Sequence, residues 1–194
     1  MKYSVFLFFI CALASSLASA QSKDEKEERV SRADFPVEAK KLCRNIPEDA
    51  KRIRFYKETD GDKISYETKY KYNKHWYSVE FDSLGTLEDI EIKIKTNEIP
   101  KKSQSRIIAY FEENSEKFDI IKIQEQYLYD RKTANLDFLL NVISKRKTLN
   151  PNYEIIVALK VGKIWELKEL TFTHSGTYLS QRTIKPNSYE YIMY

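Results

Sequence analysis

The sequence predicts an α+β fold of two tandem units, each a helix packed on a mostly four-stranded antiparallel sheet, with an extra helix inserted in the second unit. Apolar and polar side chains alternate along several segments, as in half-buried strands, and other segments carry apolar residues three or four positions apart, as helices do. In addition, residues 77–85 (YSVEFDSLG) and 168–176 (KELTFTHSG) each read as a strand that ends in Phe-x-x-x-Gly. This similarity predicts that one helix-and-strands unit occurs twice.

The N-terminal segment reads as an export signal. Lys2 gives a positive start, residues 5–17 are apolar, and Ala18-Ser19-Ala20 fits the small-x-small cleavage rule. The apolar run is shorter than the roughly 20 residues that a membrane span needs. We therefore expect residues 1–20 to be a signal peptide, cleaved near Ala20, with release of a soluble protein into the periplasm or the medium. Residues 21–34 are rich in charge and are expected to be a solvated tail.

The first unit is expected at residues 35–98. A helix with an apolar face begins near Phe35 and ends at Pro47, because proline inside a helix costs about 3 kcal/mol. Period-two alternation then predicts four strands, and Asp60-Gly61-Asp62 predicts the first hairpin turn. The expected apolar strand faces are Ile53 and Phe55; Ile64, Tyr66, Thr68, Tyr70 and Tyr72; Tyr77, Val79 and Phe81; and Ile90, Ile92 and Ile94.

The second unit is expected at residues 99–185. Its helix begins near Ser103, after Ile99-Pro100, and a further helix at about 134–147 is inserted after the first strand. The expected apolar strand faces are Ile121 and Ile123; Tyr153, Ile155, Val157 and Leu159; and Leu170 and Phe172. Residues 186–194 are expected to be a C-terminal tail, in which Tyr189, Tyr191 and Tyr194 cluster.

Several of these segments resemble a known family. Ile99-Pro100 before a helix, the strand 153–157, and the strand that ends in Phe172-x-x-x-Gly176 resemble the PepSY-like domains of exported bacterial proteins. Asp82, before the turn glycine of the first unit, is the residue that this family favours, whereas Thr173 stands in that place in the second unit. Such tandem domains are classed with β-lactamase-inhibitor-like folds, in which helices cover one face of an antiparallel sheet.

The resemblance implies a non-enzymatic envelope protein with a protein-binding or inhibitory role. The inhibitors that give the fold its name use disulfides, whereas cleavage of the signal peptide would leave this chain only Cys43. That thiol lies on the apolar face of the first expected helix, so we expect it to be a core residue.

The sequence offers no catalytic site. It contains no Gly-x-Ser-x-Gly elbow, no phosphate-binding glycine loop and no His-Glu-x-x-His helix. His75 and His174 are expected in separate turns, and the residues after Asp62 alternate as a strand rather than continuing a calcium loop. We expect no enzyme activity, cofactor or metal. A formal net charge of +4, evenly mixed along the chain, does not predict a nucleic-acid partner.

The best binding candidates lie around the second expected hairpin of the first unit. Tyr70, Lys71, Tyr72, Lys74 and Trp76 combine aromatic and basic side chains, which make good contact surfaces. The alternative is that the tyrosines line the helix-covered face of the sheet while the lysines face water. Two functions remain open: a module that binds an envelope or secreted protein, and a carrier of a small ligand or glycan on a tyrosine-lined sheet face.

Overall fold

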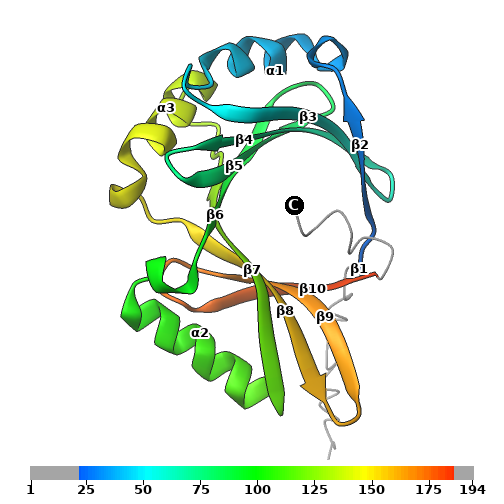
Figure 1. The fold of residues 1–194 in the computed structure, drawn as a ribbon, viewed down its shortest axis with the longest axis vertical. Helices are drawn as coiled ribbons and strands as arrows, with labels where there is room; N and C mark the ends of the chain where they lie inside the picture. The colour runs from blue at the N-terminus through cyan, green and yellow to red at the C-terminus, as the bar shows by residue number, and fades with distance from the viewer. Residues whose placement is uncertain (1–21, 186–194) are drawn as a thin grey trace, which may run out of the picture.

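The computed structural model describes residues 22–185, and the expected signal peptide and C-terminal tail lie outside them. Its strands form one ten-stranded sheet in the order β1-β10-β9-β8-β7-β6-β5-β4-β3-β2 (Figure 1). The strands are β1 (Ser22–Lys23), β2 (Glu25–Val30), β3 (Lys51–Asp60), β4 (Lys63–Tyr72), β5 (His75–Asp82), β6 (Leu87–Ile94), β7 (Lys117–Leu128), β8 (Asn152–Val161), β9 (Ile164–Phe172) and β10 (Tyr178–Ile184).

Three α-helices lie outside this sheet: α1 (Val37–Leu42), α2 (Lys101–Asn114) and α3 (Asn135–Lys145). They are accompanied by short 3₁₀ turns at Arg32–Asp34, Cys43–Asn45, Thr96–Glu98 and Arg146–Thr148. Each helix falls where the apolar spacing predicts one, and α3 is the helix expected at about 134–147. Within residues 22–185, no helix is long and apolar enough to cross a membrane.

The prediction of two separate four-stranded units is wrong. Strand β6 pairs with β7 in an antiparallel register that sets Ile90 opposite Tyr127 and Ile94 opposite Ile123, so the sheet runs through the expected boundary without a break. The physical reason is that two separate sheets would each leave an edge of unpaired backbone groups at this point. Pairing β6 with β7 removes both edges.

The N-terminal segment closes the sheet into a nearly complete barrel. Strand β2 pairs antiparallel with β3, while β1 pairs parallel with β10 at the other end of the strand order. Only Asp24 separates β1 from β2, so residues 22–30 contact both edges of the sheet (Figure 1). These residues were expected to be a solvated tail. These charged residues can form a strand because every second side chain turns toward the polar interior of the barrel.

The hydrophobic core lies between the outer face of the sheet and the helices. Most of the expected apolar faces supply it: Tyr70, Phe81, Ile92, Ile155 and Phe172 are all fully buried. Ile53 and Ile64, which were also expected on these faces, are instead 42% and 40% exposed. Cys43 is also buried there and contacts the Thr68 hydroxyl at 3.2 Å.

Two turn glycines allow helices α1 and α2 to pack closely against the turns that follow β5 and β9. Gly85 has φ +87°, and a Cβ atom there would lie 2.8 Å from the Pro36 Cβ atom. Gly176 has φ +83°, and a Cβ atom there would lie 2.5 Å from the Ser103 carbonyl oxygen of α2. Both positions require glycine for conformation and for space. The Phe-x-x-x-Gly segments therefore mark equivalent contacts with α1 and α2.

Candidate functional site

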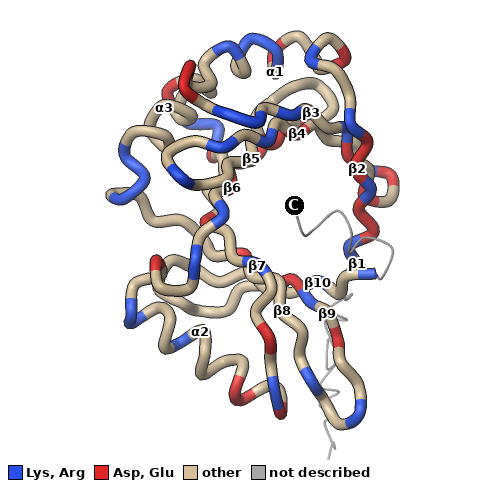
Figure 2. Tube along the Cα trace, in the orientation of Figure 1, with Lys and Arg blue, Asp and Glu red and all other residues tan. Residues whose placement is uncertain are grey.

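The inner face of the barrel is charged, in contrast to its apolar outer face. Side chains from both ends of the strand order surround a cavity of about 210 Å³. Charged positions recur around the whole ring of strands (Figure 2). The lining residues are Lys23, Glu25, Glu58, Asp60, Lys63, Ser65, Glu80, Asp89, Glu91, Gln126, Glu154 and Arg182. We call this space the acidic cavity, because seven carboxyl groups and three cationic groups line it.

Ion pairs at one side of the cavity join the closing strands to the barrel wall. The Lys23 ammonium lies 2.7 Å from both Glu169 and Glu25, and the Arg182 guanidinium also contacts Glu169. Burial would raise the pKa of Glu169, but Lys23 and Arg182 outweigh it and lower that pKa to about 2. Burial would likewise lower the pKa of Lys23, but Glu169 and Glu25 raise it well above its usual value.

Five cavity carboxyl groups have no ion pair with any residue in the range 22–185: Glu58, Glu80, Asp89, Glu91 and Glu154. Burial raises the pKa of each of them, and mutual repulsion raises most of them further, with Glu67 acting on Glu58 and Asp89 acting on Glu80. Repulsion of this kind is the expected result of placing many carboxyl groups in one enclosed space.

Of these five groups, Asp89 is the one with a buried oxygen that lacks a hydrogen-bond partner in the described part of the chain. Its side chain is 7% exposed, and Gln126 donates a hydrogen bond of 3.1 Å to its Oδ2 atom. Its Oδ1 atom is buried and has no hydrogen-bond partner among residues 22–185. Leaving a buried polar oxygen unpaired is costly, and the raised pKa of Asp89 favours the neutral, protonated acid here.

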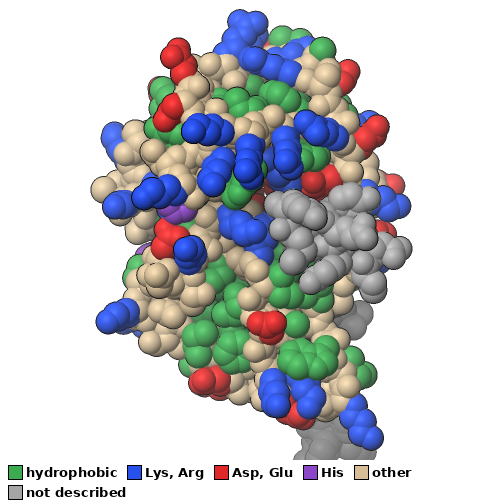
Figure 3. All heavy atoms as spheres, in the orientation of Figure 1, with side chains coloured by type: hydrophobic (Ala, Val, Ile, Leu, Met, Phe, Trp, Pro, Cys, Tyr) green, Lys and Arg blue, Asp and Glu red, His purple; other side chains and the backbone are tan. Residues whose placement is uncertain are grey.

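A smaller basic hollow lies further along the inner face. It is lined by Lys69, Lys93 and Lys122 together with Trp76, Tyr77, Ser78 and Gln124. Lys69 forms ion pairs with Glu27 and Glu67, whereas burial and the neighbouring Lys122 lower the pKa of Lys93. Basic side chains also gather across the upper part of the face seen in Figure 3. The inner face is therefore acidic in one part and basic in another.

The structure divides the five predicted binding residues between the two faces of the sheet. Tyr70 is fully buried on the outer face and stacks on Tyr77 at 5.3 Å, and Tyr72 packs near them. Lys71 and Trp76 are cross-strand partners on the opposite, inner face. Lys74 lies in the turn between β4 and β5 with φ +69°. The five residues do not form one surface, and a binding role for any of them stays a prediction.

Three large apolar side chains at the end of the β8–β9 hairpin are exposed to solvent. Val161 is 51%, Ile164 is 64% and Trp165 is 52% exposed. Val161 and Ile164 are cross-strand partners, and the hairpin extends beyond the ring of strands (Figure 1). We call these three residues the hairpin end. The sequence analysis did not single them out, although three apolar residues around a Gly162-Lys163 turn are a usable signal.

The comparisons with known proteins give a fold and no family. No family model and no curated protein matches the chain by sequence. Among solved structures, a DUF2874 family protein from Bacteroides ovatus is 11% identical, with a TM-score of 0.53 over 77% of this chain and 87% of that one. A DUF2874 family protein from Bacteroides uniformis is 11% identical, with a TM-score of 0.52 over 76% and 88%. A candidate periplasmic protein from Bacteroides eggerthii is 13% identical, with a TM-score of 0.53 over 80% and 94%. At these identities the likeness shows the fold alone.

Proposed function

We propose that this chain is an exported, non-catalytic binding protein that docks on another envelope or secreted protein through the hairpin end. The signal peptide expected at residues 1–20 is part of this proposal, and the periplasmic assignment of the Bacteroides eggerthii neighbour supports it. The observation that carries the proposal is the exposure of Val161, Ile164 and Trp165 at the tip of an extended hairpin.

The energetics favour a protein partner for this surface. A large aromatic side chain buries about 150–250 Å² when it is fully covered. Trp165 is 52% exposed, so docking would cover about 100 Å² of it and contribute about 2.5 kcal/mol at about 25 cal/mol per Å². Trp165 follows Ile164 along β9, so its side chain turns to the opposite face of the hairpin from Val161 and Ile164. An exposed Trp is a residue type enriched in interface hot spots. The protein-binding hypothesis from the sequence is thus kept, but its surface moves from Tyr72 and Trp76 to the hairpin end.

Site-specific photo-crosslinking in the producing organism tests this proposal. A photo-reactive amino acid placed at position 165 should capture one protein, whereas the same group at position 84 should not. Leu84 is a matched control because it is also an exposed apolar turn residue, at 78%. Trp165→Ser should remove the captured protein from a pull-down while the circular dichroism spectrum stays unchanged. Capture from both positions, or from neither, would contradict the proposal.

The inhibitory role implied by the family resemblance stays a prediction. If the captured protein is an enzyme, its activity is measured with and without the wild-type chain and the Trp165→Ser variant. Loss of activity with the wild-type chain only would support inhibition.

A second candidate function is the binding of a small polar ligand in the barrel interior. The acidic cavity supports this candidate. From the sequence, a carried ligand was expected on a tyrosine-lined face of the sheet. That face does not support ligand binding, because Tyr70 and Tyr77 are buried on it under the helices. A ligand in the acidic cavity would instead meet charged, hydroxyl and amide groups.

A further inference from the structure

We propose that the basic hollow binds a doubly charged oxyanion, a sulfate or phosphate group, between Lys93 on β6 and Lys122 on β7, with Trp76 on β5 beside it. These three side chains line one hollow and come from three neighbouring strands. All three are half-buried, so water and salt screen the two charges less than at an open surface. The basic hollow shares no lining residue with the acidic cavity, and the proposal does not depend on the hairpin end.

The strand register sets lysines and Trp76 in one row across the sheet. Lys71 on β4 is opposite Trp76, and Trp76 is in turn opposite Lys93. At the end of this row, Lys51 on β3 is opposite Lys71. Like charges placed directly opposite each other destabilise a strand pair. The row therefore carries a repulsion that a bound anion would relieve.

The lysines of this region lack counter-ions. Lys71, Lys93 and Lys122 form no ion pair with any residue in the range 22–185. Burial and the repulsion of Lys122 lower the pKa of Lys93. A lowered pKa is the expected response of a lysine that is partly desolvated beside another cation without an anionic partner.

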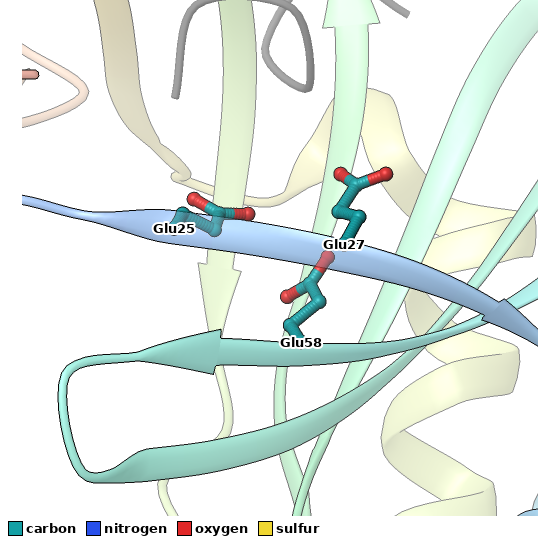
Figure 4. Close-up of side chains that lie close together, drawn as sticks. All are labelled: Glu25, Glu27 and Glu58. Carbon is teal, nitrogen blue, oxygen red and sulfur yellow. The ribbon is translucent and has the colours of Figure 1, made fainter. Parts of the chain in front are cut away.

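No carboxyl group of the described residues lines this hollow. Lys69 pairs with Glu67, and Glu91 accepts a hydrogen bond of 2.5 Å from Gln124. Lys122 acts electrostatically on Glu67 and Glu91 but forms no ion pair with either of them. A group of glutamates lies on β2 and β3 instead: Glu25, Glu27 and Glu58 (Figure 4). The negative charge of the inner face is thus concentrated away from Lys93 and Lys122.

The β8–β9 hairpin provides a second, independent observation, because it carries the same arrangement with a counter-ion present. Residues 71–76 (KYNKHW) and 160–165 (KVGKIW) share the pattern Lys-x-x-Lys-x-Trp, and in both the first Lys is the cross-strand partner of the Trp. In the second segment the ammonium group of that Lys lies 3.8 Å from Glu116. The corresponding Lys71 has no ion-pair partner in the described part of the chain. The hairpin beside the basic hollow therefore lacks the negative group that its counterpart has.

The charge and size of the hollow select the class of ligand. Two ammonium groups without counter-ions match a sulfate or phosphate group, which carries up to two negative charges, better than a single carboxylate. The hollow measures about 20 Å³, which is room for about one water-sized group. One oxygen of the anion would enter it, and the rest would lie at its mouth beside Trp76. Such a group occurs as a free ion and as a substituent of an acidic polysaccharide, whose sugar ring would then lie against the indole.

Anion binding is measured through the fluorescence of Trp76. The chain contains two tryptophans, so Trp165→Phe leaves Trp76 as its only indole. We expect sodium sulfate and dextran sulfate each to change the Trp76 emission in a saturable way at low ionic strength, with a Kd for free sulfate below about 1 mM. Uncharged dextran should leave the emission unchanged.

Three lysine variants locate the site in this background. Lys93→Gln and Lys122→Gln should each weaken sulfate affinity at least about tenfold, because each removes one of the two charges that hold the anion. The matched control is Lys74→Gln, which removes the same charge from the exposed turn of the β4–β5 hairpin and should change the affinity less than about twofold. Lys93→Gln also relieves a repulsion, so it should keep the Tm of the parent chain without sulfate and lose the rise in Tm that sulfate gives.

Sulfate binding that is lost in Lys93→Gln and Lys122→Gln and kept in Lys74→Gln supports the proposal. Within that result, dextran sulfate that binds at least about tenfold more tightly per sulfate group than the free ion identifies a polysaccharide as the source, and equal affinity identifies the free ion. No saturable change with either ligand overturns the proposal. Equal loss in all three variants, or equally tight binding of polyglutamate, also overturns it, because general attraction of negative charge would then account for the binding.

Discussion

Replacing Lys23 with methionine tests whether the N-terminal segment is part of the fold. The Lys23 ammonium lies 2.7 Å from Glu169 on β9 and 2.7 Å from Glu25 on β2. Glu169 is 2% exposed, so it would lose a cationic partner without gaining water. Methionine has a similar length and is apolar, so the substitution removes the charge and keeps most of the packing.

The expected cost follows from the remaining partner of Glu169. Removing one partner of a buried ion pair costs about 3–5 kcal/mol when the other charge is left alone. Arg182 still contacts Glu169 in the variant, so we expect a smaller loss of about 2–3 kcal/mol in the free energy of unfolding. For a domain of this size that corresponds to a fall in Tm of about 4–12 °C.

Urea unfolding monitored by circular dichroism measures this loss, and Lys26→Met is the matched control. Lys26 is exposed on the neighbouring strand β2, so its replacement should change stability by less than about 0.5 kcal/mol. Equal stability of Lys23→Met, Lys26→Met and the wild-type chain would refute the reasoning. Residues 22–30 would then be a solvated tail, as their composition suggests.

Three further predictions concern the glycine contacts, the buried tyrosine and the cavity carboxyl groups. Gly85→Ala should destabilise the fold by at least about 2 kcal/mol more than Gly61→Ala in urea unfolding, because both have positive φ but only Gly85 would clash. Tyr70→Phe should leave Tm equal or higher, because the buried Tyr70 hydroxyl has no hydrogen-bond partner within residues 22–185, and a fall of more than about 4 °C would contradict this. Stability should fall as the pH rises above about 4.5, because the raised pKa values of Glu80, Asp89 and Glu154 let the folded state keep protons that the unfolded state releases. Below about pH 4 the low pKa of Glu169 reverses the trend, so urea midpoints should peak between about pH 4 and 5.

The outer face of the sheet could be predicted from sequence alternation. Phe81 and Phe172 were expected on apolar strand faces and are fully buried under the helices, as is Tyr70, for which this was the alternative to a binding role. Period-two alternation identifies which side chains share a face, and apolar side chains identify that face as the core. The three helices could be placed by the same reasoning at a period of 3.6.

The enclosed inner face could not be predicted. Polar and apolar residues alternate in the same way whether the polar face of a strand meets bulk water or lines an enclosed polar space. Glu67 and Lys69 alternate with the apolar residues of β4, a pattern that is equally typical of a face open to solvent. In the structure Glu67 is 3% exposed and lies 2.9 Å from the Lys69 ammonium. What encloses them is the pairing of β2 with β3 together with the pairing of β1 with β10, and the second of these joins residues 161 positions apart, such as Ser22 and Thr183. Long-range pairing of this kind leaves no local signal in residues 22–30.

The hydrogen exchange of residues 22–30 tests the central claim, closure of the barrel by the N-terminal segment, most directly. Exchange is followed by mass spectrometry on a peptide that covers this segment. The account predicts that the β2 amides bonded to β3 exchange far more slowly than those of an unstructured peptide of the same sequence, and that Lys23→Met speeds their exchange. Complete exchange of the whole segment within seconds, as in a solvated tail, would contradict the account.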